Sequence, residues 1–135
     1  MAAGYSGTPL PGKLGIVEGS SVAILGDPGH AHALLADRPE ATALDGDPAT
    51  ADVTLWFVTS RDELERRVVE LSEAIFPDRS LWVAWPKRAS GVQTNVTEDV
   101  VRELALPLGL VDNKVCAIDG TWSGLRLVWR RERRT

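Results

Sequence analysis

The stretch from Trp85 to Gly91, WPKRASG, gathers side chains that can bind an anion. Lys87 and Arg88 bring two cations, Ser90 brings a hydroxyl, and Gly91 gives the backbone freedom to turn. Arginine and lysine commonly hold phosphates and carboxylates, arginine through two parallel N–H groups. The stretch follows an apolar run, so we expect it at the carboxyl end of a strand. The alternative interpretation is a solvated basic loop beside a core tryptophan.

A second stretch, SVAILGDPGH at residues 21–30, predicts a strand, a tight turn and a helix, which is where α/β proteins bind cofactors. Gly26 and Gly29 are present, but Pro28 stands where a dinucleotide fingerprint needs its second glycine. Pro28 lacks an N–H and Asp27 repels phosphate, so the turn disfavours a diphosphate. S-adenosylmethionine has no phosphate, so these two residues do not exclude it. Its methionine end would lie near Gly26, Asp27 and Gly29. It is not favoured, because the usual acidic-G-x-G-x-G pattern of methyltransferases is absent. The competing interpretation is a plain turn with Asp27 as a helix cap.

Other polar residues carry weaker signals. Asp45 lies roughly 20 positions after the glycine turn, where an acidic residue can bind a ribose, but it also fits a turn before Gly46. His30 and His32 would point to different sides of a helix, so we predict no shared metal site. Cys116 is the single cysteine, which excludes an internal disulfide. No nucleophile, base and orienting group occur together, so no catalytic residue is predicted.

Composition limits the class of protein. The chain has 135 residues, 44% of them hydrophobic, which fits one globular domain. Its net charge of −4 argues against a protein that coats nucleic acid. We expect neither a signal peptide nor a membrane span, because no apolar run is long enough or suitably placed. With a single cysteine, these features predict a cytoplasmic protein.

Alternating apolar runs and amphipathic segments predict the elements that position these residues. Strands are expected at 21–25, 42–44, 52–58, 81–85, 114–118 and 125–129. Helices are expected to begin at Asp27-Pro28, at Ser60 through a capping box with Glu63, and near Asn95 through a box with Glu98.

This pattern predicts an α/β fold, a three-layer Rossmann-like sandwich with a mostly parallel sheet. The last two strands are joined by a short link, so they should form a C-terminal antiparallel hairpin. Residues 45–52 leave no room for a strand and a helix, so one βα unit is missing. We therefore predict a truncated methyltransferase-like sheet in one domain, residues 1–135, with an arm at 1–20, a core at 21–130 and a polar tail at 131–135.

Several blocks carry a family resemblance. They are YSGTPL in the arm, LWVAWPK and the following SG, then DNKVCA, and finally WSGLR. With these blocks the chain resembles a family of small, stand-alone bacterial proteins that is common in actinobacteria and has no established activity. The resemblance implies a fold similar to class I S-adenosylmethionine-dependent methyltransferases without their usual glycine motif. It marks Tyr5 and Thr8 as signature positions and implies no catalytic role.

Three hypotheses follow from these observations. In the first, a non-enzymatic or regulatory domain binds an anionic small molecule or a protein partner at the carboxyl edge of the sheet. Lys87, Arg88, Ser90 and Gly91 would form that site, with Tyr5 and Thr8 of the arm beside it. The second is a reduced S-adenosylmethionine-dependent methyltransferase that uses Gly26, Asp27, Gly29 and Asp45. The third is a protein–protein interaction module with exposed tryptophans. None of the three involves nucleic acid, a membrane or a metal.

Overall fold

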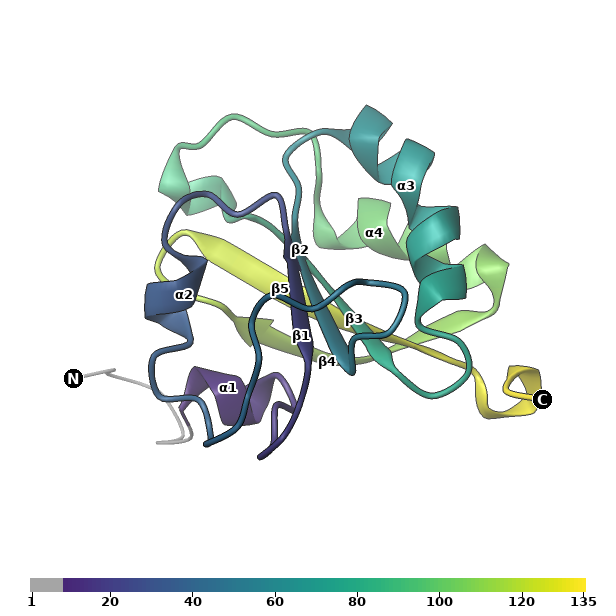
Figure 1. The fold of residues 1–135 in the computed structure, drawn as a ribbon. Helices are drawn as coiled ribbons and strands as arrows, with labels where there is room; N and C mark the ends of the chain where they lie inside the picture. Colours follow the sequence, from purple (N-terminus) through teal and green to yellow (C-terminus); the bar gives the residue numbers. More distant parts are fainter. Residues whose placement is uncertain (1–8) are drawn as a thin grey trace.

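The computed structural model describes residues 9–135, which form one five-stranded sheet in the order β1-β2-β3-β5-β4 (Figure 1). The first three strands run parallel, whereas β5 runs antiparallel to both β3 and β4. This confirms the predicted α/β fold with a C-terminal hairpin. The strands are β1 (Val22–Leu25), β2 (Val53–Phe57), β3 (Ser80–Pro86), β4 (Leu110–Ala117) and β5 (Trp122–Trp129).

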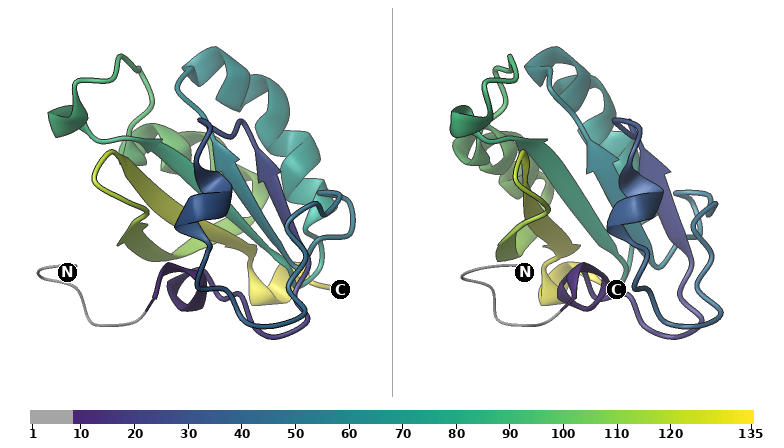
Figure 2. Two further views of the ribbon diagram at one scale, coloured as in Figure 1. Left: turned by 60° about the vertical axis from the view of Figure 1, so that its left-hand side comes forward. Right: turned by 90° about the vertical axis from the view of Figure 1, so that its left-hand side faces the viewer.

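Helices lie on both sides of the sheet, so the molecule has three layers (Figures 1 and 2). Helices α3 and α4 cover one face, and the short helices α1 and α2 lie on the other. The helices are α1 (Leu10–Lys13), α2 (Ala31–Leu34), α3 (Arg61–Ala74) and α4 (Glu98–Ala105), with 3-10 turns η1 (Arg88–Ser90), η2 (Leu106–Leu108) and η3 (Arg131–Arg133).

Each face of the sheet has its own hydrophobic core, because alternate strand residues point to opposite sides. Trp56 and Val83 pack with Leu64 of α3 on one face. Trp82 and Leu55 pack on the other face, and the indole Nε1 of Trp82 donates to the carbonyl of Leu14 at 3.0 Å. This bond fixes the segment after α1 to the centre of the sheet.

The predicted strand at 42–44 is wrong as an element. Only Ala43 pairs, in a single parallel bridge with Ser21 on the side of β1 that faces away from β2. The chain turns back at Gly46, so the ladder cannot extend. A single bridge therefore stands where an outer strand was predicted, which agrees with a sheet that lacks a βα unit.

Two predicted helix starts are also wrong. α2 begins at Ala31 rather than Pro28, because the Asp27 carboxylate closes a turn by accepting from the N–H groups of Gly29 at 2.7 Å and Ala31 at 3.1 Å. α4 begins after Thr97, whose hydroxyl accepts from Val100 N–H at 3.2 Å. Loop 26–30 is therefore longer and less helical than its sequence indicates.

Asn95, the predicted cap of α4, serves a different helix. Its Oδ1 accepts from the backbone N–H of Arg61 at 2.8 Å, at the first residue of α3. Ser60 caps α3 as predicted, because its hydroxyl accepts from Glu63 N–H at 3.3 Å. The 86–97 loop is thus tied to the start of α3.

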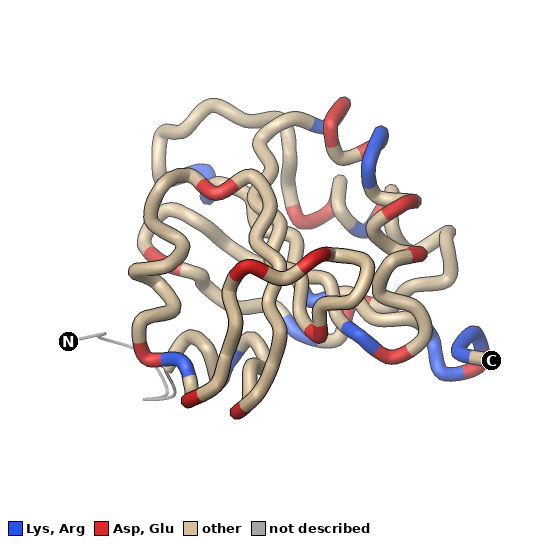
Figure 3. The backbone as a smooth tube through the Cα atoms, viewed as in Figure 1, with Lys and Arg blue, Asp and Glu red and all other residues tan. Residues whose placement is uncertain are grey.

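Every helix within residues 9–135 is too short or too polar to cross a bilayer. Acidic and basic residues are mixed along α3, whereas the only charged residues of the 86–97 loop are Lys87 and Arg88 (Figure 3).

Candidate functional site

The carboxyl ends of β1, β2 and β3 lie at one edge of the sheet, and the turn between β4 and β5 lies at the same edge. Asp119 of that turn joins three loops. Its Oδ2 lies 2.9 Å from His30 Nε2, and its backbone carbonyl accepts from Lys87 Nζ at 2.9 Å. Its Oδ1 accepts from the N–H groups of Thr121 and Trp122, both at 2.8 Å. Asp119 therefore links the 26–30 loop, the 86–97 loop and the turn between β4 and β5.

The environment of Asp119 favours its charged form. Partial burial alone would raise the pKa of the carboxyl, but the bonds from His30, Trp122 and Thr121 outweigh it and lower the pKa below 3.8. The carboxylate is therefore the favoured form at neutral pH, whereas the bond from Lys87 goes to the backbone carbonyl and does not depend on that charge.

Of the four predicted loop residues, Arg88 is the one left free for a ligand. Lys87 is occupied by Asp119, so its role here is structural. The Ser90 hydroxyl donates to the Lys87 carbonyl at 2.6 Å and accepts from Val92 N–H at 3.1 Å, which closes η1. Gly91 has φ +79° and ends η1 in the left-handed conformation. Arg88 is exposed, and its guanidinium has no hydrogen bond or ion pair within residues 9–135.

A pocket of about 510 Å³ lies beside this loop. Its wall is largely apolar, and Arg88 is the only charged group among the described residues that line it. A smaller pocket of about 340 Å³ adjoins it and shares Gln93 and Thr94. The larger pocket is lined by Trp85, Pro86, Arg88, Gly91, Val92, Gln93, Thr94, Val96 and Thr97. Together they form a cleft at the ends of β2 and β3 with one cation at its rim.

The glycine turn after β1 packs closely against β2. Gly26 has φ +66°, and a methyl group there would overlap the backbone carbonyl oxygen of Phe57 in β2. The space that Gly26 leaves is therefore filled by the neighbouring strand. Asp27 Oδ1 accepts from two backbone N–H groups, and Oδ2 lies 4.0 Å from His32 Nδ1. Burial raises the pKa of Asp27, but the bonds from Gly29, Ala31 and His30 outweigh it and lower the pKa overall.

Asp45 lies apart from this turn. The next residue, Gly46, donates its N–H to the carbonyl of Val22 at 2.9 Å, at the first residue of β1. At roughly 3.3 Å per residue, this is about 10 Å below the last residue of that strand. The structure does not bring Asp45 to Gly26 or Gly29, so the residues that would hold an adenosyl cofactor in the usual way are not assembled.

Two of the predicted site residues, Tyr5 and Thr8, lie outside the described residues. Trp122 is 7% exposed and packs edge-on against Phe57, with ring centroids 5.1 Å apart. Four of the five tryptophans are buried, so the prediction of an interface of exposed tryptophans is wrong. The sequence does not mark Asp119 as a site residue, because the Asp-Gly pair at 119–120 predicts only a hairpin turn.

Comparisons with solved structures find the same fold. The chain is similar to a methyltransferase from Aquifex aeolicus that depends on S-adenosylmethionine, at 14% identity and a TM-score of 0.63, over 86% of this chain and 85% of that one. It is also similar to magnesium protoporphyrin IX methyltransferase from Synechocystis PCC 6803 with bound S-adenosylmethionine, at 14% identity and 0.57, over 86% and 73% of the chains.

A third similar structure is an O-methyltransferase from neocarzinostatin biosynthesis, in complex with S-adenosylmethionine and 2-hydroxy-5-methyl naphthoic acid. It matches at 14% identity and a TM-score of 0.60, over 82% of this chain and 49% of that one. No family model and no curated protein matches the chain, so the resemblance to an actinobacterial family stays a prediction. At this level of identity, the comparisons establish that the chain has the methyltransferase-like Rossmann fold.

Proposed function

We propose that this chain binds a small anion with an apolar body in the pocket beside the 86–97 loop. The observation that carries the proposal is Arg88, whose guanidinium has no partner within residues 9–135 and lines a largely apolar pocket. A guanidinium in this position can bind a carboxylate or phosphate through two N–H groups, while the wall around Trp85 and Val96 covers the apolar part. The naphthoic acid bound by one similar methyltransferase belongs to this chemical class.

Arg88 is expected to contribute much of the affinity for the anion. A hydrogen bond to a charged group contributes about 1.5–3 kcal/mol net, so removing the guanidinium should weaken binding roughly 10- to 100-fold. Lys87 is expected to behave differently. Its loss should lower the free energy of unfolding, because Asp119 would lose a bond that joins two loops.

A reduced methyltransferase is the second candidate, and the fold comparisons favour it over a purely non-enzymatic role. On this chain, S-adenosylmethionine would have to bind without the usual contacts, because Gly26, Asp27 and Asp45 do not form a cradle for it. The pocket beside Arg88 would then hold the methyl acceptor.

Calorimetric titration separates these candidates. The probes are phenyl phosphate, benzoate, inorganic phosphate, S-adenosylmethionine and S-adenosylhomocysteine. We expect phenyl phosphate and benzoate to bind more tightly than inorganic phosphate, because only they use the apolar wall. Arg88→Gln should weaken both, and Arg66→Gln, which changes an exposed arginine on α3, should weaken neither.

Two outcomes would change the assignment. Equal affinity of the wild type and Arg88→Gln for phenyl phosphate and benzoate would refute the anion site. Binding of S-adenosylmethionine would favour the methyltransferase candidate, and it would be established by methyl transfer to an added acceptor.

A further inference from the structure

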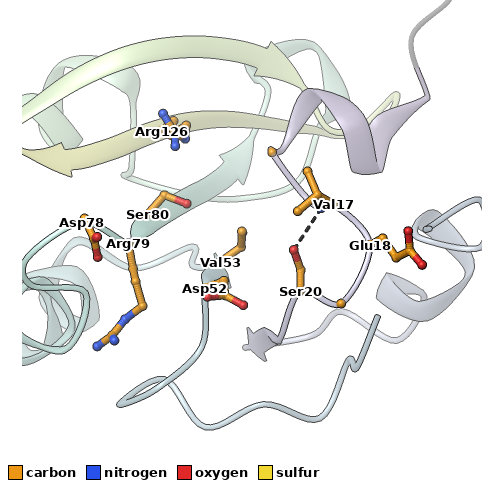
Figure 4. Close-up of a pocket in the computed structure, with 11 residues that line it drawn as sticks. Val17, Glu18, Ser20, Asp52, Val53, Asp78, Arg79, Ser80 and Arg126 are labelled. Carbon is orange, nitrogen blue, oxygen red and sulfur yellow. Dashed lines mark hydrogen bonds between the residues drawn. The ribbon is translucent and has the colours of Figure 1, made fainter. Parts of the chain in front are cut away.

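A separate pocket of about 390 Å³ lies at the opposite, amino edge of the sheet (Figure 4). The segment after α1 forms one side of it, and the starts of β2 and β3 form the other. Arg126 contributes from the middle of β5, where it pairs with Trp82 of β3. This pocket shares no lining residue with the carboxyl-edge cleft.

Arg126 is a half-buried cation whose side chain has no partner in the part of the chain that the structure describes. Its Nε is buried and has no hydrogen bond, and the side chain forms no ion pair within residues 9–135. Burial lowers the pKa of Arg126, and the positive charge of Arg134 lowers it further. Burying a charge without a counterion is costly, and buried polar groups in native proteins are almost always hydrogen-bonded. The guanidinium therefore lacks an anion that would neutralise it.

Arg79, the other arginine of this pocket, also has a buried Nε without a hydrogen bond, but the rest of its guanidinium is engaged. Arg79 Nη2 donates to the backbone carbonyls of Ala49, at 3.0 Å, and Ala74. Those bonds tie the end of α3 to the loop before β2, so Arg79 has a structural role. Arg126 makes no such bond, and this leaves it available to a bound molecule.

Acidic side chains surround the rest of the pocket. Ser80 lies between Arg126 and Asp52 in Figure 4, and Asp78 and Glu18 also line the cavity. Asp52 Oδ2 accepts from Ser21 N–H at 2.9 Å, whereas Asp78 has no side-chain partner within the described chain. Three carboxylates would repel a doubly charged phosphate, but they would attract an amine.

We propose that the amino-edge pocket binds a small zwitterion. Its carboxylate would be bound by Arg126 with the Ser80 hydroxyl, and its ammonium group by Asp52 and Asp78. Arginine suits a carboxylate because its planar N–H groups match the two oxygens. This site is independent of the anion pocket at the carboxyl edge.

Three molecules with the same four-carbon chain test the two halves of the site: 4-aminobutyrate, butyrate and butylamine. Their binding is followed by chemical-shift changes in ¹H–¹⁵N NMR spectra, with inorganic phosphate as a fourth probe. We expect 4-aminobutyrate to bind most tightly, with shift changes at Ser80 and Arg126. Arg126→Gln should weaken it at least tenfold, and Arg130→Gln, which changes an exposed arginine at the end of β5, should not.

A second variant keeps the proposal testable if Arg126→Gln does not fold. Asp78→Asn should weaken 4-aminobutyrate severalfold, because it removes a partner of the ammonium group, and it should not weaken butyrate, because it removes a negative charge that repels the anion. The proposal is overturned if phosphate binds more tightly than 4-aminobutyrate, if butyrate and 4-aminobutyrate bind equally, or if no probe shifts residues of this pocket. Arg88→Gln should change none of these results, so this test is separate from that of the carboxyl-edge site.

Discussion

Replacing Gly26 with alanine tests whether the turn after β1 has a structural role. The native φ of +66° costs alanine about 1–2 kcal/mol. The added methyl group would also overlap the Phe57 carbonyl, which belongs to the backbone of β2 and cannot rotate away. Overpacking of this kind typically costs about 1–3 kcal/mol. We therefore expect Gly26→Ala to lower the free energy of unfolding by about 2–5 kcal/mol in total.

Gly15→Ala is the matched control, because Gly15 has φ +84° and open space where the methyl group would lie. Gly15→Ala should lower the free energy of unfolding only by the cost of the positive φ, about 1–2 kcal/mol. Urea unfolding of both variants, followed by tryptophan fluorescence, measures the difference. If Gly26→Ala costs no more than Gly15→Ala, then β2 does not fill the space at Gly26, which would refute this reasoning.

Three further predictions follow from local contacts. Thr97→Ala should cost about 1 kcal/mol of stability in urea unfolding, because Thr97 caps α4; no loss would refute that assignment. Asp119 has a pKa below its ordinary 3.8, so it stabilises the fold above that value and stops doing so as the pH falls through its folded-state pKa. Acid unfolding should therefore become less steep in Asp119→Asn, and an unchanged pH profile would contradict the role of this residue. Burial raises the pKa of the Cys116 thiol, so iodoacetamide should modify the folded chain more slowly than the unfolded chain at neutral pH; equal rates would contradict this.

Much of the sheet could be predicted because buried strands leave a strong local pattern. The apolar runs around Trp56 and Trp82 are long enough to be recognised as strands without knowing their partners. The predicted strand at 42–44 failed because a strand needs a neighbour along its length. Ala43 finds one only at Ser21, and no local pattern reveals that the chain turns away at Gly46.

The sequence predicts the candidate site only in part, because several of its contacts join residues that lie far apart in the chain. The loop after Trp85 could be identified from its charges, but the division of roles between Lys87 and Arg88 depends on Asp119, which is far away in sequence. The pairing of His30 with Asp119 spans 89 positions and has no sequence signal. Asn95 and Thr97 can both cap a helix, and only the tertiary position of Asn95 beside α3 decides between them.

The most direct test of the central claim is a ¹H–¹⁵N NMR titration of the wild-type chain with phenyl phosphate. The account predicts chemical-shift changes concentrated between Trp85 and Thr97, and their loss in Arg88→Gln. Shift changes concentrated instead in the turn from Gly26 to His30, and unaffected by Arg88→Gln, would contradict it.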